Sequence, residues 1–160
     1  MLETGLRLLL AAVIGGLIGL NRDLRGKDAG VRTHALVAVG AALIVVASAT
    51  LTDEPNHRAD AISRVAQGVL TGIGFLGAGV ILRDESRNRV RGLTTAATVW
   101  MTSLVGVACA VGAYREVLAG TLLVFAILQF GGPIERLVDR RDRSRDEGAG
   151  EPAAGALPPP

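Results

Sequence analysis

The sequence predicts an all-α membrane protein, a polytopic bundle of about five transmembrane helices without a water-soluble domain. Of the 160 residues, 49% are apolar but only 3% are aromatic, and 21 are glycine. Small residues in long apolar runs suit helices that pack closely against each other in lipid. The charged residues lie in short clusters between uncharged stretches, and these stretches approach the length of about 20 residues that a bilayer-spanning helix needs.

These stretches define five expected spans, at residues 6–20, 33–51, 65–82, 92–113 and 117–133. The first includes Arg7, whose side chain can extend to the membrane interface. The first could instead be a secretory signal peptide, because it is short and amino-terminal. We interpret it as a transmembrane helix, because it opens with Glu3 rather than a basic cluster and lacks an Ala-x-Ala pattern before Asn21. It also ends at Arg22, where a stop-transfer flank is expected.

The orientation is predicted from the basic residues, which are retained on the cytoplasmic side of a membrane. They concentrate in the first loop, the third loop and the tail: Arg22, Arg25, Lys27 and Arg32; Arg83, Arg87, Arg89 and Arg91; and five arginines between residues 136 and 145. The amino terminus is therefore expected outside and the carboxyl terminus in the cytoplasm. Residues 1–133 would form the transmembrane domain, and residues 134–160 a disordered cytoplasmic tail, with a short interfacial helix over 134–141 as an alternative.

Several function classes are disfavoured by composition. The net charge is only +2 and the basic residues lack interleaved aromatics, so we expect no nucleic-acid binding. Cys109 is the only cysteine, which excludes an intrachain disulfide or a cysteine metal site. His34 opens the second expected span, whereas His57, the only other histidine, falls in the loop on the opposite side of the membrane. We therefore expect no enzyme, no cofactor and no metal site.

Small residues recur at four-residue spacing along three of the expected helices. These series are Ala11, Gly15 and Gly19; Gly68 and Gly72; and Thr98, Thr102, Gly106 and Ala110. Each lies along one helical face, which is typical of helix packing in membranes. The segment Gly72, Gly74, Gly77 and Gly79 resembles a dinucleotide fingerprint, but it lies inside an apolar span rather than in a strand-to-helix turn. We interpret these glycines as packing residues, with a bendable transport helix as the alternative.

Two polar groups of residues are the candidate functional sites. One is a stripe at steps of three and four on the fourth span, formed by Arg91, Thr94, Thr95, Thr98 and Thr102. Its simplest interpretation is hydroxyls bonded to carbonyls of their own helix. The other is a cluster at the expected cytoplasmic face, formed by Asn21, Arg22, Asp23, Arg32, Thr33, His34, Arg83 and Asp84. We expect that Asp23 can bridge Arg32 or Arg91. One histidine and one aspartate are too few for a metal site.

Four blocks of sequence resemble the membrane region of the MgtC/SapB family: GLNRD, AGVRTHALVAVGAAL, GIGFLGAGVILR and RGLTTAATVW, in this order over roughly the first 115 residues. The resemblance implies an inner-membrane protein that supports growth when magnesium is scarce. It also implies a regulator of other membrane complexes, including the proton-driven ATP synthase, rather than a magnesium carrier. The chain departs from the family at Asn21, where an acidic residue is usual, and it would be a short form without the soluble carboxyl-terminal domain. The virulence role of some members is therefore not carried over.

The leading functional hypothesis is a non-enzymatic protein of the bacterial inner membrane that modulates a partner complex or membrane energetics. The alternative is a small cation or solute transporter. Transport would need polar groups near the bilayer midplane, and the spans offer Gln67, Thr71, Thr98, Thr102 and Gln129 but no midspan carboxylate. The expected partners are the lipid bilayer, another membrane complex, and a second copy of the chain through its glycine faces.

Overall fold

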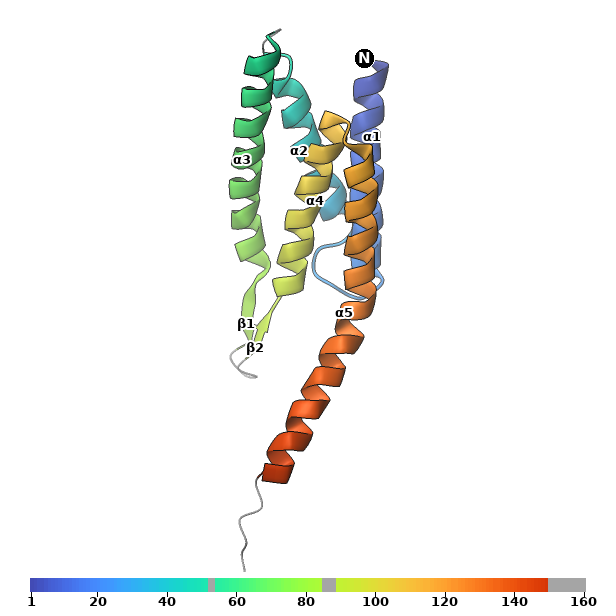
Figure 1. The fold of residues 1–160 in the computed structure, drawn as a ribbon, viewed down its shortest axis with the longest axis vertical. Helices are drawn as coiled ribbons and strands as arrows, with labels where there is room; N and C mark the ends of the chain where they lie inside the picture. Colours follow the sequence, from blue (N-terminus) through green and yellow to red (C-terminus); the bar gives the residue numbers. More distant parts are fainter. Residues whose placement is uncertain (52–53, 85–88, 150–160) are drawn as a thin grey trace, which may run out of the picture. The chain divides into compact units, whose positions relative to one another are not determined.

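The computed structural model describes the backbone of residues 1–51, 54–84 and 89–149. This part of the chain contains five helices and one hairpin: α1 (Leu2–Asp23), α2 (Val31–Ser48), α3 (Pro55–Val80), β1 (Leu82–Asp84), β2 (Arg89–Arg91), α4 (Leu93–Val111) and α5 (Tyr114–Ala149) (Figure 1). The helices match the five expected spans one to one, and each is long and apolar enough to cross a membrane. The multi-pass helical class is thereby confirmed, whereas the orientation stays a prediction.

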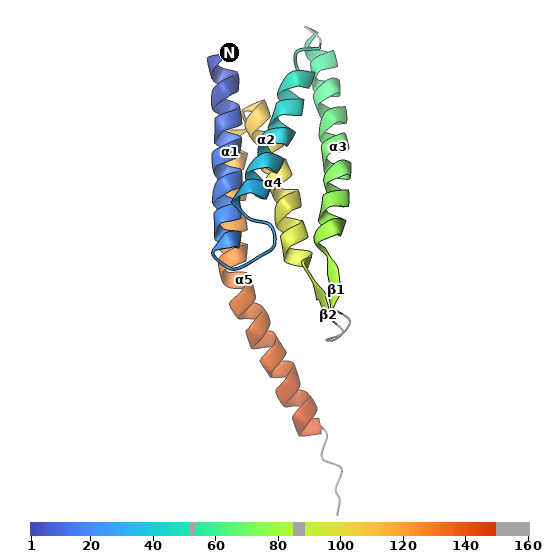
Figure 2. The ribbon, with the colours of Figure 1, turned by 180° about the vertical axis from the view of Figure 1, so that it is seen from behind.

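Helix α4 is the central helix of the bundle. Half of its span is buried, against 11% for α3, because it packs against α1, α2 and α3. Figures 1 and 2 show α3 flanking α2 and α4 on the side away from α1. The core between α1, α2 and α4 is built mainly from small side chains: Ala11, Ala38, Ala42, Val45, Val105, Cys109 and Ala110. These side chains permit the close helix approach that was expected from composition.

Two of the three small-residue series lie at helix contacts. A Cβ atom at Gly15 would lie 2.7 Å from the His34 carbonyl oxygen, and one at Gly19 would lie 2.5 Å from that of Gly30. On α4, a Cβ atom at Gly106 would collide with the backbone of Ala38. The remaining series, Gly68 and Gly72, has no other atom of the described chain within 4 Å of an added Cβ. Only the series on α1 and α4 therefore serves packing within the chain.

The hairpin between α3 and α4 was not expected from the sequence, which suggested only a charged loop. Its strands are antiparallel and pair Leu82 with Arg91 and Arg83 with Val90. Gly92 follows β2 with φ +89°, and a Cβ atom added to it would collide with the Val80 carbonyl, so only glycine fits there without strain. The hairpin thus holds the end of α3 next to the start of α4.

The chain divides into two compact units, Met1–Val124 and Phe125–Pro160. In the second unit, α5 continues through Pro133 to Ala149, over the segment for which we expected a tail, with a short helix at residues 134–141 as the alternative to disorder. Composition favours this helix, since residues 134–149 include five arginines, two glutamates and one leucine, which are good helix formers. The disorder predicted for residues 150–160 falls outside the described residues, and the cytoplasmic position of the tail stays a prediction.

Candidate functional site

Arg22 is a buried cation at the end of α1. Only 3% of the residue is exposed, and its Nη2 donates a hydrogen bond of 3.0 Å to Thr95 Oγ1 on α4. Its Nε is buried and has no hydrogen-bond partner among the described residues. A cation in the last turn of a helix interacts favourably with the negative end of the helix dipole. Arg22 therefore joins α1 to α4 through one charged hydrogen bond.

His34 connects α2 to the same part of α4. The residue is fully buried in the first turn of α2, with Nδ1 2.9 Å from the Gly30 carbonyl oxygen and Nε2 3.3 Å from Thr98 Oγ1. Because a carbonyl only accepts, Nδ1 carries a proton. The Thr98 hydroxyl also lies 2.8 Å from the Thr95 carbonyl oxygen. Its single hydrogen can serve either that oxygen or His34 Nε2, so the network has two alternative hydrogen arrangements.

Asp23 stabilises the start of α2 from the preceding helix. Its Oδ2 accepts a hydrogen bond of 2.9 Å from the Val31 backbone N–H, although its side chain is exposed. A Cβ atom at Gly30 would collide with this carboxylate, so the contact requires glycine there. The ion pairs of the described residues do not include the expected bridge from Asp23 to Arg32 or Arg91. Asp23 instead acts as a helix-capping acceptor.

The residues of the threonine stripe differ in their burial. Thr95, Thr98 and Thr102 are buried, whereas Arg91 and Thr94 are exposed. Thr98 donates to the Thr95 carbonyl and Thr102 to the Thr98 carbonyl, at 2.8 and 2.7 Å. This agrees with the expected bonding of hydroxyls to their own helix. What the sequence could not indicate is that Thr95 accepts from Arg22, 73 positions earlier.

The side chains of the candidates Arg83 and Asp84 lie outside the described part of the structure. The other remaining candidates fall into three groups. Arg32 and Thr33 are exposed in the first turn of α2, at the same end of the bundle as Arg22. Asn21 is half-buried and its Oδ1 has no hydrogen-bond partner in the described part of the chain. Of the four candidate glycines on α3, only Gly77 is buried, with Ala96 Cβ 3.6 Å from an added Cβ. At Gly72, Gly74 and Gly79 an added Cβ would have no other atom of the described residues within 4 Å.

The structure thus brings together the buried network of Arg22, His34, Thr95 and Thr98, from three helices. It does not bring the α3 glycines into this network. Within residues 1–51, 54–84 and 89–149, no group of three or more His, Cys, Asp or Glu side chains could hold a metal ion. Sequence reasoning missed Gly30, whose signal was a glycine three residues before the expected span at 33–51. The network is suited to holding helix ends together, since its groups bond to each other.

Comparison with known proteins identifies a membrane-protein family. The sequence model of the MgtC family matches residues 8–137. The chain is 44% identical to the protein SrpB of Synechococcus elongatus over 133 residues, which cover 79% of this chain and 72% of SrpB. It is 46% identical to MgtC of Salmonella typhimurium over 119 residues, and 40% identical to MgtC of Brucella abortus over 129 residues. These matches cover 74% and 81% of this chain.

The chain spans about half the length of the MgtC proteins that it matches, 48% for the Salmonella protein and 51% for the Brucella protein. No solved structure matches it. The matched region includes α2, α3 and α4 and most of α1, so it contains the whole network at Arg22 and His34.

Proposed function

The chain belongs to the MgtC family, and on this premise we propose that it is a non-enzymatic protein of the bacterial inner membrane that modulates another membrane complex or membrane energetics. Growth in low magnesium is the condition in which this activity would matter. The proposal assigns the modulating contact to the end of the bundle that carries the Arg22 and His34 network. That end is the cytoplasmic one in the predicted orientation.

The observation that carries the proposal is the engagement of buried hydroxyls on α4. Thr102 and Ser103 each donate to a carbonyl of α4 itself at 2.7 Å. The single Thr98 hydrogen serves either the Thr95 carbonyl of α4 or His34 Nε2, both inside the bundle. A transport path through lipid needs polar groups that can bind and release a passing solute. Hydroxyls that are bonded along their own helix are better suited to stabilising a packed bundle. This pattern supports a modulator over a carrier.

A surface for a protein partner is available at the same end. Arg32 and Thr33 on α2, Arg91 at the end of β2 and Thr94 on α4 are exposed. The network of Arg22, His34, Thr95 and Thr98 is buried. An exposed arginine can pair with carboxylates in two-pronged geometry, and arginine is enriched among residues that dominate interface energy. We therefore assign the partner contact to these four exposed residues.

The partner contact is tested by co-purification from membranes after chemical cross-linking. Arg32→Ala should weaken recovery of the partner about tenfold, as expected for an interface arginine that contributes about 1.4 kcal/mol. Arg115→Ala is the matched control, because Arg115 is an exposed arginine in the first turn of α5 and lies outside the four-residue surface. Equal recovery with both variants would refute the assignment of the contact to this surface.

Arg32 is a better probe than Asp23, because Asp23 also holds the start of α2 and its replacement would change the fold and the surface together. The transporter alternative is tested separately by reconstituting the purified protein in liposomes. We expect no flux of divalent cations or protons above that of empty liposomes. Saturable flux that depends on the protein would overturn the modulator proposal.

A further inference from the structure

The exposed face of α3 differs in composition from that of α1. Helix α3 lies at the edge of the bundle (Figures 1 and 2), and only 11% of its span is buried. Among the described side chains of α3, the exposed large apolar ones are Phe75 and Leu76, whereas those of α1 are Leu2, Leu6, Leu9, Val13, Leu17 and Leu20. The other exposed residues of α3 between Asp60 and Gly79 are polar, charged or small. Such a face is poorly suited to contact with lipid chains.

Gln67 is the polar side chain of this face that most needs a partner. It is exposed and lies inside the His57–Val80 span, so in a single copy of the chain its amide would face hydrocarbon. Its hydrogen bond within the described residues is long, 3.5 Å from Nε2 to Ser63 Oγ of the same helix. Thr71, one turn further along, instead donates to the Gln67 carbonyl at 2.9 Å. An amide offers two donors and an acceptor, and leaving them unpaired in hydrocarbon is unfavourable.

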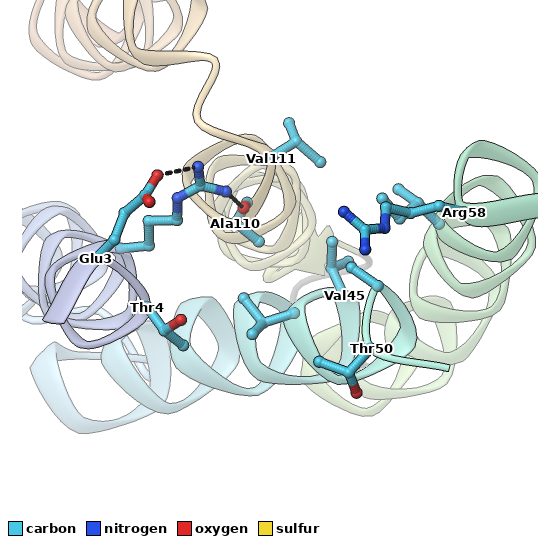
Figure 3. A pocket seen from close by; sticks show the side chains of 11 residues that line it. Glu3, Thr4, Val45, Thr50, Arg58, Ala110 and Val111 are labelled. Atoms are coloured by element: carbon cyan, nitrogen blue, oxygen red, sulfur yellow. Dashed lines mark hydrogen bonds and ion pairs between the residues drawn. The ribbon is translucent and has the colours of Figure 1, made fainter. Parts of the chain in front are cut away.

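Polar side chains that point into the bundle find partners within the chain. Arg7 on α1 forms an ion pair through Nη2 with Glu3 Oε1 at 2.6 Å and donates through Nη1 to the Ala110 carbonyl oxygen, as Figure 3 shows. Thr102 on α4 donates to the carbonyl of its own helix. The amide of Gln67 lies on a face that is turned away from the bundle. Its partner must therefore come from outside the chain.

A second copy of the chain fits this face by symmetry. Two copies that are inserted in the same direction are related by a two-fold axis along the membrane normal, so their α3 helices run parallel and identical residues lie at the same depth. Two Gln67 amides can then pair, because each both donates and accepts. The face also carries both signs of charge, since the exposed residues Asp60 and Arg64 lie one turn apart. Asp60 of one copy can pair with Arg64 of the other.

Gly68 and Gly72 allow the two backbones to come close. A Cβ atom added at either position would have no other atom of the described chain within 4 Å, so packing within the chain does not require these glycines. Glycines at four-residue spacing permit close contact between membrane helices. We propose that this face of α3, formed by Asp60, Arg64, Gln67, Gly68, Thr71, Gly72 and Phe75, joins two copies of the chain in the membrane. The Gln67 amides pair across the contact, and the two glycines lie at the closest approach.

Association is measured by energy transfer between donor-labelled and acceptor-labelled full-length protein in liposomes, at decreasing protein density. The unchanged protein should show transfer above that of random proximity. Gly68→Ile should weaken association about tenfold or more, because a bulky side chain holds the helices apart. Gly40→Ile is the matched control, because Gly40 is an exposed glycine on α2 that also lacks neighbours of an added Cβ in the described chain. It should associate like the unchanged protein.

Gln67→Leu tests the amide pair. Leucine suits lipid, so this variant should stay folded while association weakens about 3-fold to 20-fold, the range expected for a hydrogen bond between membrane helices. Thermal unfolding checks that all variants are folded. Transfer by the unchanged protein no greater than random proximity would overturn the proposal, and so would association of Gly68→Ile or Gln67→Leu equal to that of Gly40→Ile.

Cross-linking in native membranes identifies the occupant of the face. Gly68→Cys in a Cys109→Ala background, treated with a short bifunctional maleimide, should give a product of twice the mass of the chain. Gly40→Cys in the same background should give none. Absence of the Gly68→Cys dimer, or a product that contains a different protein, would overturn the proposal. These measurements do not involve the surface at Arg32, so either proposal can fail without the other.

Discussion

Gly106→Ala should push α2 and α4 apart and destabilise the bundle. The new Cβ atom would lie 2.2 Å from the Ala38 carbonyl oxygen and 3.0 Å from two further backbone atoms of Ala38. A carbon–oxygen contact normally needs about 3.3 Å, so the helices must separate by about 1 Å at this point. Neighbouring backbone cannot move aside as a flexible side chain can. The small residues of α2 and α4 around this contact would then no longer pack closely against each other.

The expected cost combines two opposing effects. Overpacking of a close-packed core costs about 1–3 kcal/mol, whereas replacing a helical glycine by alanine gains about 0.5–1 kcal/mol. The clash is with backbone, so the larger cost applies and the net loss should be about 2 kcal/mol. Reversible unfolding in mixed micelles measures it through the fluorescence of Trp100, the only tryptophan and a residue of α4.

Gly40→Ala is the matched control on α2. Gly40 is exposed and has no other atom of the described chain within 4 Å of an added Cβ. The same substitution should therefore stabilise the protein by about 0.5–1 kcal/mol through helix propensity alone. Opposite signs at the two positions would support close α2–α4 packing. If Gly106→Ala were as stable as Gly40→Ala, the reasoning about backbone approach would be refuted.

Three further substitutions test the helix ends by the same unfolding measurement. Thr95→Val leaves the buried Arg22 guanidinium without its acceptor and should lower the free energy of unfolding by about 1–3 kcal/mol. Thr94→Val, at the exposed neighbouring position, should change it by less than about 0.5 kcal/mol. Equal effects of the two substitutions would contradict the network. Asp23→Ala removes the acceptor of the Val31 N–H at the start of α2 and should lower the free energy of unfolding by about 0.5–2 kcal/mol. A similar loss in Asp28→Ala would indicate that any negative charge in the loop has this effect. Gly112→Ala places a side chain at φ +80° and should lower the free energy of unfolding by about 1 kcal/mol. An unchanged free energy of unfolding would contradict that backbone conformation.

The positions of the helices could be predicted from the sequence because hydrocarbon imposes a length and an uncharged composition on every span. Those requirements act on each segment separately, so they can be recognised without knowing the neighbours. The hairpin at residues 82–91 was missed because no such requirement acts on a short loop. Its Gly92 is required by the position of Val80, twelve residues away. The continuation of α5 past Pro133 was missed because a change from apolar to charged residues ends a membrane span but does not end a helix.

The candidate site was predicted only in part, and the reason is again the distance between partners. Arg22 and His34 were selected because a charge or a histidine beside a span needs an explanation. Their acceptors Thr95 and Thr98 lie 73 and 64 positions away, and helical periodicity cannot pair residues of different helices. The role of Asp23 was predicted as an ion pair, whereas its carboxylate accepts a backbone N–H. Backbone groups are identical at every position, so sequence patterns do not reveal such partners.

The close packing of α1, α2 and α4 bears on how the protein could act on a partner. Gly15, Gly19 and Gly106 each place backbone against backbone, so sliding of one helix along another would produce clashes at these points. Helix α2 has 18 residues and therefore rises about 27 Å from the end of the bundle that carries the Arg22 network to the opposite end. A ligand at one end can influence the other only by shifting these helices. The packing opposes such a shift, which favours modulation through the exposed surface of a rigid bundle over transmission of a conformational change across it.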